Sequence, residues 1–100
     1  MSASRFVPLQ LGLSVIRRGS PRLPTVILIH DVGSGSAETW PDSLIDALTP
    51  GHDIVRYDQR GHGRSSRPVG EHGITDLADD LDALIGQLEL GRVDLIGHGV

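Results

Sequence analysis

The stretch TVILIHDVGSG, residues 25–35, decides the fold of this chain. It begins with an unbroken run of mostly β-branched apolar residues and then changes abruptly to glycine and serine. Such a run is expected of a strand that is covered on both faces, which is the environment of a strand in a parallel sheet. Residues 52–58 and 92–97 repeat the type, and each is followed by a turn that contains glycine. The sequence therefore predicts parallel strands whose functional turns lie at their carboxyl ends.

Two segments between these strands show the spacing of amphipathic helices. The first has Pro41 near its start and is stopped by Pro50 and Gly51. Its apolar stripe consists of Trp40, Leu44, Ile45 and Leu48. The second is predicted to begin at Thr75, a residue that caps helices well. Its apolar face consists of Leu77, Leu81, Leu84, Ile85 and Leu88, and its solvated face of Asp79, Asp80 and Asp82.

Residues 6–10 and 13–17 are predicted to form two weaker strands around Gly12, which pair as a hairpin. The predicted order is then β-β-β-α-β-α-β, which is an α/β fold with a mostly parallel sheet. No internal repeat or linker interrupts residues 1–100, so we expect a single unit. The last predicted strand is at an edge, where Val93, Leu95 and Ile96 are expected to be exposed.

The composition excludes several classes of protein. The net charge is −4 and all nine basic residues are arginine, so we expect no nucleic-acid partner. The absence of cysteine excludes a disulfide framework, a thiolate nucleophile and a cysteine-based zinc site, and it makes the cytoplasm the default location. No apolar run has the length of a membrane span, and the first ten residues lack the apolar core of an export signal, so we expect no membrane partner.

The glycine turns permit more than one interpretation. Gly33, Gly35 and Glu38 follow the dinucleotide-binding pattern as far as its third position, where a glutamate replaces the small residue and disfavours NAD. In the second turn, DQRGHGRSS (residues 58–66), His62 is a candidate for metal binding or proton transfer. No second ligand stands at a recognisable spacing, so we expect a structural corner, braced by Asp58 and the guanidinium of Arg60 or Arg64.

Three segments in this order and spacing resemble the first half of an α/β-hydrolase: TVILIHDVGSG, VRYDQRGHGRSS (residues 55–66) and VDLIGHG (residues 93–99). The resemblance covers nearly the whole chain. The corner DQRGHGRSS and the segment ITDLADDLDALI (residues 74–85) are similar to those of bacterial 3-oxoadipate enol-lactone hydrolases and polyketide methylesterases. The resemblance implies the amino-terminal half of the fold, ending at the turn that carries the nucleophile.

The resemblance also implies site residues. Gly99 matches the family's nucleophilic serine and has no hydroxyl, whereas the backbone N–H groups of Val32 and Val100 match the two oxyanion-hole donors. The catalytic acid and histidine would follow Val100 in chain order. His98 matches a variable flanking position, and Asp31 stands where the family has glycine. The implied substrate is a small ester or lactone, with no metal and no cofactor.

Two alternatives to this hydrolase remain open. The first is a non-catalytic protein that binds a small carbonyl compound, which the absence of a hydroxyl at Gly99 favours. The second is an NAD-binding Rossmann domain. The sequence leaves the substrate and the oligomeric state open.

Overall fold

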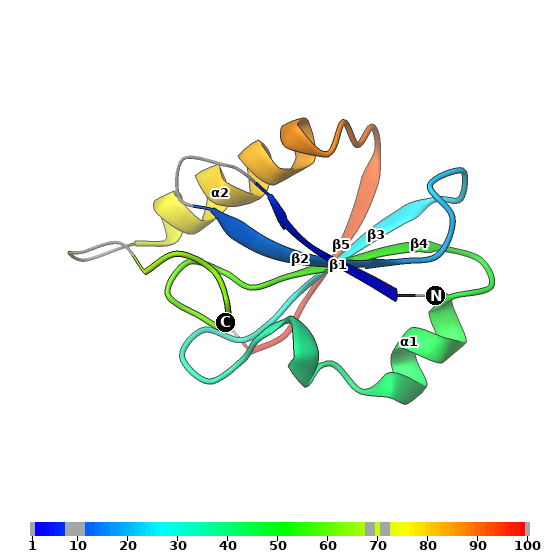
Figure 1. Ribbon diagram of the computed structural model, residues 1–100, viewed down its shortest axis with the longest axis horizontal. Coiled ribbons are helices and arrows are strands. Elements are labelled where there is room, and N and C mark those ends of the chain that lie inside the picture. The colour runs from blue at the N-terminus through cyan, green and yellow to red at the C-terminus, as the bar shows by residue number, and fades with distance from the viewer. Residues whose placement is uncertain (1, 8–11, 68–69, 71–72, 100) are drawn as a thin grey trace.

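The structure of the chain, a computed structural model, describes residues 2–7, 12–67, 70 and 73–99. Its centre is a five-stranded sheet in the spatial order β1-β2-β4-β3-β5 (Figure 1). The strands are β1 (Ser2–Val7), β2 (Leu13–Arg18), β3 (Thr25–Ile29), β4 (Asp53–Tyr57) and β5 (Val93–Gly97). The last three are parallel to one another, whereas β1 pairs antiparallel with β2 and β2 with β4. The predicted α/β class, order and hairpin are thus present.

The first strand differs from its predicted bounds. We expected a strand over residues 6–10, but β1 covers Ser2–Val7 and pairs with β2 along its whole length. Residues 8–10 of that prediction lie outside the described part of the chain. The bounds of an edge strand are set by its pairing with the neighbouring strand. The local pattern of apolar residues does not reveal that pairing.

Helices cover both faces of the sheet (Figure 1). On one face, α2 (Ile74–Gln87) packs its Leu84 into a buried cluster formed by Leu13, Val15, Ile27, Val55 and Tyr57. On the other face, α1 (Asp42–Leu48) packs Ile45 against Val26, Leu28 and Ile54. A short 3-10 helix, η1 (Ala37–Thr39), precedes α1 and was not expected from the sequence. It forms because Ser36 and Thr39 cap it reciprocally through their hydroxyl groups.

The start of α2 corrects a second prediction. Thr75 lies within the first turn of the helix, whereas the N-cap is Gly73. The Asp76 carboxylate accepts a hydrogen bond from the Gly73 N–H at 2.9 Å, so an acidic side chain from inside the helix satisfies the free donor. The helix therefore begins where a carboxylate three residues further along can reach back.

Charged groups and exposed apolar groups lie in different parts of the sheet. At the amino edge of the parallel strands, Asp53 is fully buried and accepts hydrogen bonds from Arg17 and Thr25. At the free side of β5, Leu95 is 51% exposed and Ile96 39% exposed, as expected for an uncovered edge. Val93 is half-buried because it packs against the α2 cluster. Within the described residues, no helix combines the length and apolar character needed to cross a bilayer.

Candidate active site

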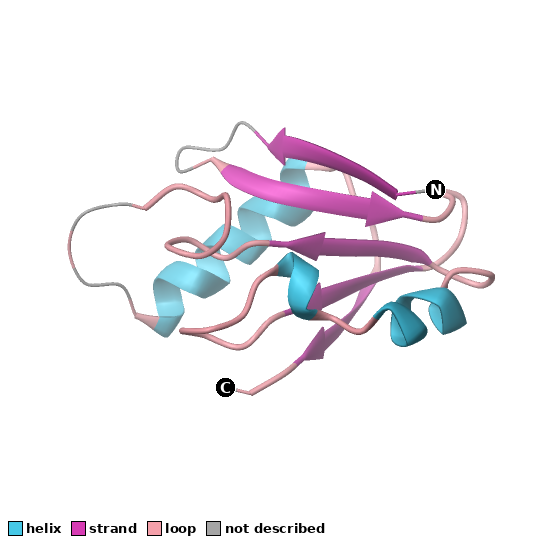
Figure 2. Ribbon diagram, turned by 60° about the horizontal axis from the view of Figure 1, so that its bottom comes forward, coloured by secondary structure: helices cyan, strands magenta, loops and turns pink. Residues whose placement is uncertain are grey.

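The turns that follow β3, β4 and β5 lie at one edge of the sheet (Figure 2). Because these strands are parallel and in register, their carboxyl ends meet there. The first turn covers residues 31–36 and leads into η1, the second covers residues 58–66, and the third begins after Gly97. This juxtaposition was predicted, and it is the place where parallel sheets carry ligands.

His30, at the end of β3, joins the first two turns. Its side chain is buried, with 3% exposure, and its Nε2 accepts a hydrogen bond from the Gln59 N–H at 2.9 Å. Its Nδ1 therefore carries the proton and donates to the carbonyl of Asp31 at 2.8 Å. Burial lowers the pKa of His30, which favours the same neutral form. The Gln59 side-chain amide also donates to the His30 carbonyl at 2.7 Å.

Asp58 joins the second turn to η1 through backbone amides. Its carboxylate accepts hydrogen bonds from the N–H groups of Ala37, at 2.7 Å, and Arg64, at 3.0 Å. The expected brace between Asp58 and a guanidinium is therefore wrong. Gly63 makes the tight corner possible, because its φ is +49° and a Cβ there would collide with the Asp58 carboxylate. The corner is held by amide donors to the Asp58 carboxylate and by the Arg67 guanidinium, which donates to the carbonyls of Gly61 and Gly63.

Arg60 reaches α2 instead of Asp58. Its Nε and Nη2 donate to the two carboxylate oxygens of Asp80 at 2.7 and 2.8 Å. Both side chains are nearly buried, with 11% and 13% exposure, so the predicted solvation of Asp80 is also wrong. The paired geometry raises the pKa of Arg60 and ties the second turn to α2. The helical spacing did not reveal a partner that lies 20 residues away in the chain.

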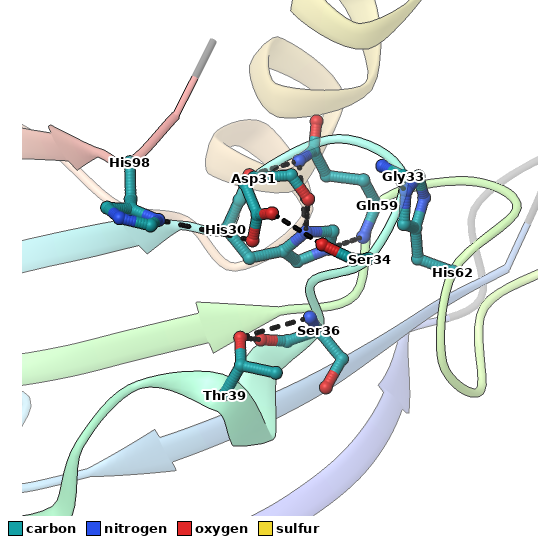
Figure 3. A network of polar contacts seen from close by, with 9 residues as sticks. All are labelled: His30, Asp31, Gly33, Ser34, Ser36, Thr39, Gln59, His62 and His98. Carbon is teal, nitrogen blue, oxygen red and sulfur yellow. Dashed lines mark hydrogen bonds and ion pairs between the residues drawn. The ribbon is translucent and has the colours of Figure 1, made fainter.

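Asp31 and Gly99 come together between the first and third turns. Gly99 has a φ of +62°, and a Cβ at this position would stand 3.0 Å from the Cβ of Asp31. Asp31 accepts a hydrogen bond from the Ser34 hydroxyl at 2.8 Å, which lowers the pKa of its carboxyl group. Its other oxygen lies 4.0 Å from Nδ1 of His98 (Figure 3). A side chain at position 99 would therefore make a tight contact with the Cβ of Asp31.

A cavity of about 220 Å³ opens beside these turns. Val32, His98 and Gly99 are among the residues that line it, and Val32 is 54% exposed. Its apolar wall comes from α2, through Ile74, Leu77, Ala78 and Leu81. His98 lines the cavity, is exposed, and has its ring centroid 6.1 Å from that of Trp40 in an edge-to-face arrangement. The lining of the cavity is mostly apolar, so it suits an apolar group.

The structure brings two of the three predicted site residues to this cavity. Val32 and Gly99 lie on its wall, whereas Val100 lies outside the described residues. Sequence reasoning missed Gln59, which hydrogen-bonds His30 and also lines the cavity. Its place directly after a strand end was the available signal. Among the described residues, no group of three potential ligands could hold a metal ion.

Comparison with known proteins supports this description. Residues 24–99 match the family model described as alpha/beta hydrolase fold. The chain is 38% identical over 100 residues to a protein of Mycobacterium tuberculosis named probable oxidoreductase EphD, an alignment with 95% of this chain and 17% of that protein. It is also 38% identical over 81 residues to the putative carbamate hydrolase RutD of Rhizobium rhizogenes, with 80% of this chain and 30% of that protein.

Solved structures agree. Epoxide hydrolase A from Mycobacterium thermoresistibile superposes on 99% of this chain and 32% of its own, with a TM-score of 0.89 and 30% identity. A hydrolase from Pseudomonas aeruginosa covers 94% of this chain and 36% of its own, with a TM-score of 0.86 and 30% identity.

The chain thus spans between about a sixth and a third of the curated relatives that it matches. The matched residues run from the residue before β3 to the turn after β5, and they include the whole glycine loop over residues 33–38. That loop therefore belongs to a hydrolase fold, and the dinucleotide-binding interpretation of it is not needed. On its sequence, its sheet and the turns at the carboxyl edge, this chain belongs to the α/β-hydrolase fold family.

Proposed function

We propose that the carboxyl edge of the sheet is the carbonyl-binding part of a hydrolase active site for small esters or lactones, with Gly99 at the position of the nucleophile. The observation that carries the proposal is the left-handed backbone of Gly99, directly after a parallel strand and at the wall of the cavity. A sharp turn of this kind projects a side chain from a sheet edge towards a ligand.

Each neighbour then has a chemical role. The N–H groups of Val32 and Val100 donate to the substrate carbonyl oxygen, whose negative charge grows as a tetrahedral intermediate forms. The apolar wall of α2 receives the hydrocarbon part of the ester or lactone. The acid and histidine of the mechanism are assigned to residues that follow position 100.

Binding without hydrolysis is the second candidate function, and the pair Asp31 and Gly99 favours it. Glycine offers no side-chain atom that can attack a carbonyl, and the Cβ of Asp31 stands 3.0 Å from where the Cβ of a nucleophilic residue would be. A negative charge beside the developing oxyanion also opposes acyl transfer. In this form the site holds a neutral carbonyl compound and releases it unchanged.

A chimeric enzyme separates the two functions. Residues 1–100 would replace the matching segment of the Pseudomonas aeruginosa hydrolase, which supplies the remainder of the fold. We would compare the chimera as it stands with its Asp31→Gly/Gly99→Ser variant, using p-nitrophenyl acetate hydrolysis. The double variant supplies a hydroxyl at position 99 and removes the Asp31 side chain that crowds this position, and Gly99→Ser alone tests the effect of that crowding.

We expect the double variant to hydrolyse the ester at least about 10⁴-fold faster than the unaltered chimera, because removing a nucleophile costs about 10⁶ in turnover. Equal rates in the two chimeras would refute the assignment of position 99. Binding of γ-butyrolactone to both chimeras, with hydrolysis by the double variant alone, would establish the unaltered site as a binding site.

A further inference from the structure

The loop that carries Val32 has little packing to hold it. Val32 is 54% exposed, and Gly33 and Ser34 are exposed as well. Gly33 has a φ of +106°, and a Cβ there would meet nothing within 4 Å, so neither its backbone preference nor a neighbour restricts this part of the loop. Segments with few buried contacts open easily unless hydrogen bonds hold them.

A hydrogen bond from the second turn holds the loop just after Val32. The Gly33 N–H donates to Nε2 of His62 at 2.7 Å, across 29 residues of sequence (Figure 3). The peptide group on the amino side of Val32 is held through the Asp31 carbonyl, which accepts hydrogen bonds from Nδ1 of His30 and from the Gly35 N–H. The peptide group on the carboxyl side of Val32 is therefore fixed by a side chain of the second turn.

The ring of His62 is itself fixed at both nitrogen atoms. Its Nδ1 lies 2.9 Å from the carbonyl of Arg60, so Nδ1 carries the proton and Nε2 is left as an acceptor. The ring also contacts that of His30, with centroids 4.8 Å apart. Arg60 is held in turn by Asp80 of α2. The acceptor offered to Gly33 is thus fixed to the rest of the fold through the second turn and α2.

We propose that His62 is a positioning residue, which holds the Gly33 amide and thereby aims the neighbouring Val32 N–H at the carbonyl-binding site. His62 touches no reacting atom, and its effect on chemistry passes through the loop. The catalytic consequence rests on the role proposed above for Val32, whereas the holding of the loop stands on the hydrogen bonds alone. Fixing a donor before the reaction is what makes an oxyanion hole effective.

The first test measures hydrogen exchange of backbone amides by NMR in the 100-residue chain. His62→Phe keeps a ring of similar size and removes both hydrogen bonds, whereas His62→Gln keeps an acceptor oxygen near the place of Nε2. His52→Phe is the matched control, because His52 lies before β4 at the opposite edge and contacts only the carbonyl of Leu48 among its described hydrogen-bond partners.

We expect the Gly33 amide to exchange about 10- to 100-fold faster in His62→Phe, since its hydrogen bond and the order of the loop are lost together. His62→Gln should restore slow exchange, and His52→Phe should leave it unchanged. Unchanged protection of Gly33 in His62→Phe would overturn the proposal, and so would an equal loss in His62→Phe and His62→Gln.

The second test uses the chimera with Asp31→Gly/Gly99→Ser. His62→Phe should lower kcat about 10-fold or more with little change in KM, because a misplaced donor weakens binding of the transition state more than of the substrate. A rise in KM alone would overturn the positioning role. A chimera with no activity at all would count against the proposed function, and the exchange of Gly33 would still decide the role of His62.

Discussion

The amino and carboxyl ends of the parallel strands, called here the amino edge and the carboxyl edge, pair their polar groups in different ways. At the amino edge, the side chains of Arg17, Asp53 and Thr25 satisfy one another and connect β2, β4 and β3. At the carboxyl edge, the side chains of Asp58 and His62 accept hydrogen bonds from backbone amides of the loop between β3 and α1. The first arrangement couples strands, and the second shapes loops. A fold can therefore use polar side chains for stability at one end of its strands and for the geometry of a site at the other.

The largest effect is expected at the amino edge. Asp53→Ala would leave the Arg17 guanidinium, whose side chain is 21% exposed, without its bidentate partner. We expect a loss of about 3 kcal/mol in the free energy of unfolding, because breaking a buried pair leaves an uncompensated charge. Urea unfolding measures it. The matched control is Asp46→Ala, because the Asp46 side chain is 64% exposed in its pair with Arg18 and its loss should cost less than about 1 kcal/mol. Equal losses would show that the two pairs do not differ in this way.

Asp58→Ala tests the carboxyl edge. It removes the acceptor of the Ala37 and Arg64 amides, and the Ala37 amide is left buried. We expect a loss of about 2 kcal/mol, since hydrogen bonds to a charged group are worth about 1.5–3 kcal/mol. Asp82→Ala, on the exposed face of α2, is the control. A loss below about 0.5 kcal/mol in the urea midpoint analysis would contradict the role given to Asp58.

The close approach of Asp31 and Gly99 predicts a smaller change in the free energy of unfolding, whose size depends on both residues. Gly99→Ala should cost about 1–2 kcal/mol, because a left-handed backbone strains an L-residue. It should cost less in an Asp31→Gly background, where the new Cβ loses the neighbour that it would meet at 3.0 Å. Gly86→Ala, in α2 with open space around it, should instead stabilise the chain by about 0.5–1 kcal/mol. Additive costs at positions 31 and 99 would show that the contact is unimportant.

The smallest effect concerns pH. Burial lowers the pKa of His30 below its value in the unfolded chain, so the unfolded chain takes up the proton first as the pH falls. The contribution of His30 to stability is complete above the unfolded value of about 6.5, and it is lost as the pH falls towards the folded value. Between pH 8 and 5, the melting temperature should therefore fall less in His30→Gln than in the unaltered chain. Parallel declines would contradict the account.

Several parts of this fold and site were predictable from local sequence. The apolar runs predicted β3, β4 and β5, and the helical stripes predicted that Leu84 and Ile45 face the sheet. The place of Gly99 at a turn after β5 was also predictable, because glycine follows a strand end there. The cap of α2 and the helix η1 were not, since a neighbouring carboxylate or hydroxyl decided each of them.

The partners of the charged groups were also beyond local patterns. Helical periodicity placed Asp80 on the solvated face of α2, but the second turn brings Arg60 over that face and pairs with it. The arginines of the corner suggested that Asp58 would meet the guanidinium of Arg60 or Arg64, but its carboxylate accepts from the amides of Ala37 and Arg64. A charged side chain can reach more than one neighbour, so the partner that it contacts depends on how whole elements pack.

The spacing of apolar residues along the chain was enough to predict which segments become strands and helices, because it shows which face of each element is buried. The sequence also placed three glycine turns at the carboxyl ends of parallel strands. Only the tertiary structure decided that His62 holds the amide of Gly33, and that Asp31 takes the space beside Gly99. Those contacts join residues about 30 or more positions apart, and their distances exist only once the sheet has aligned the loops.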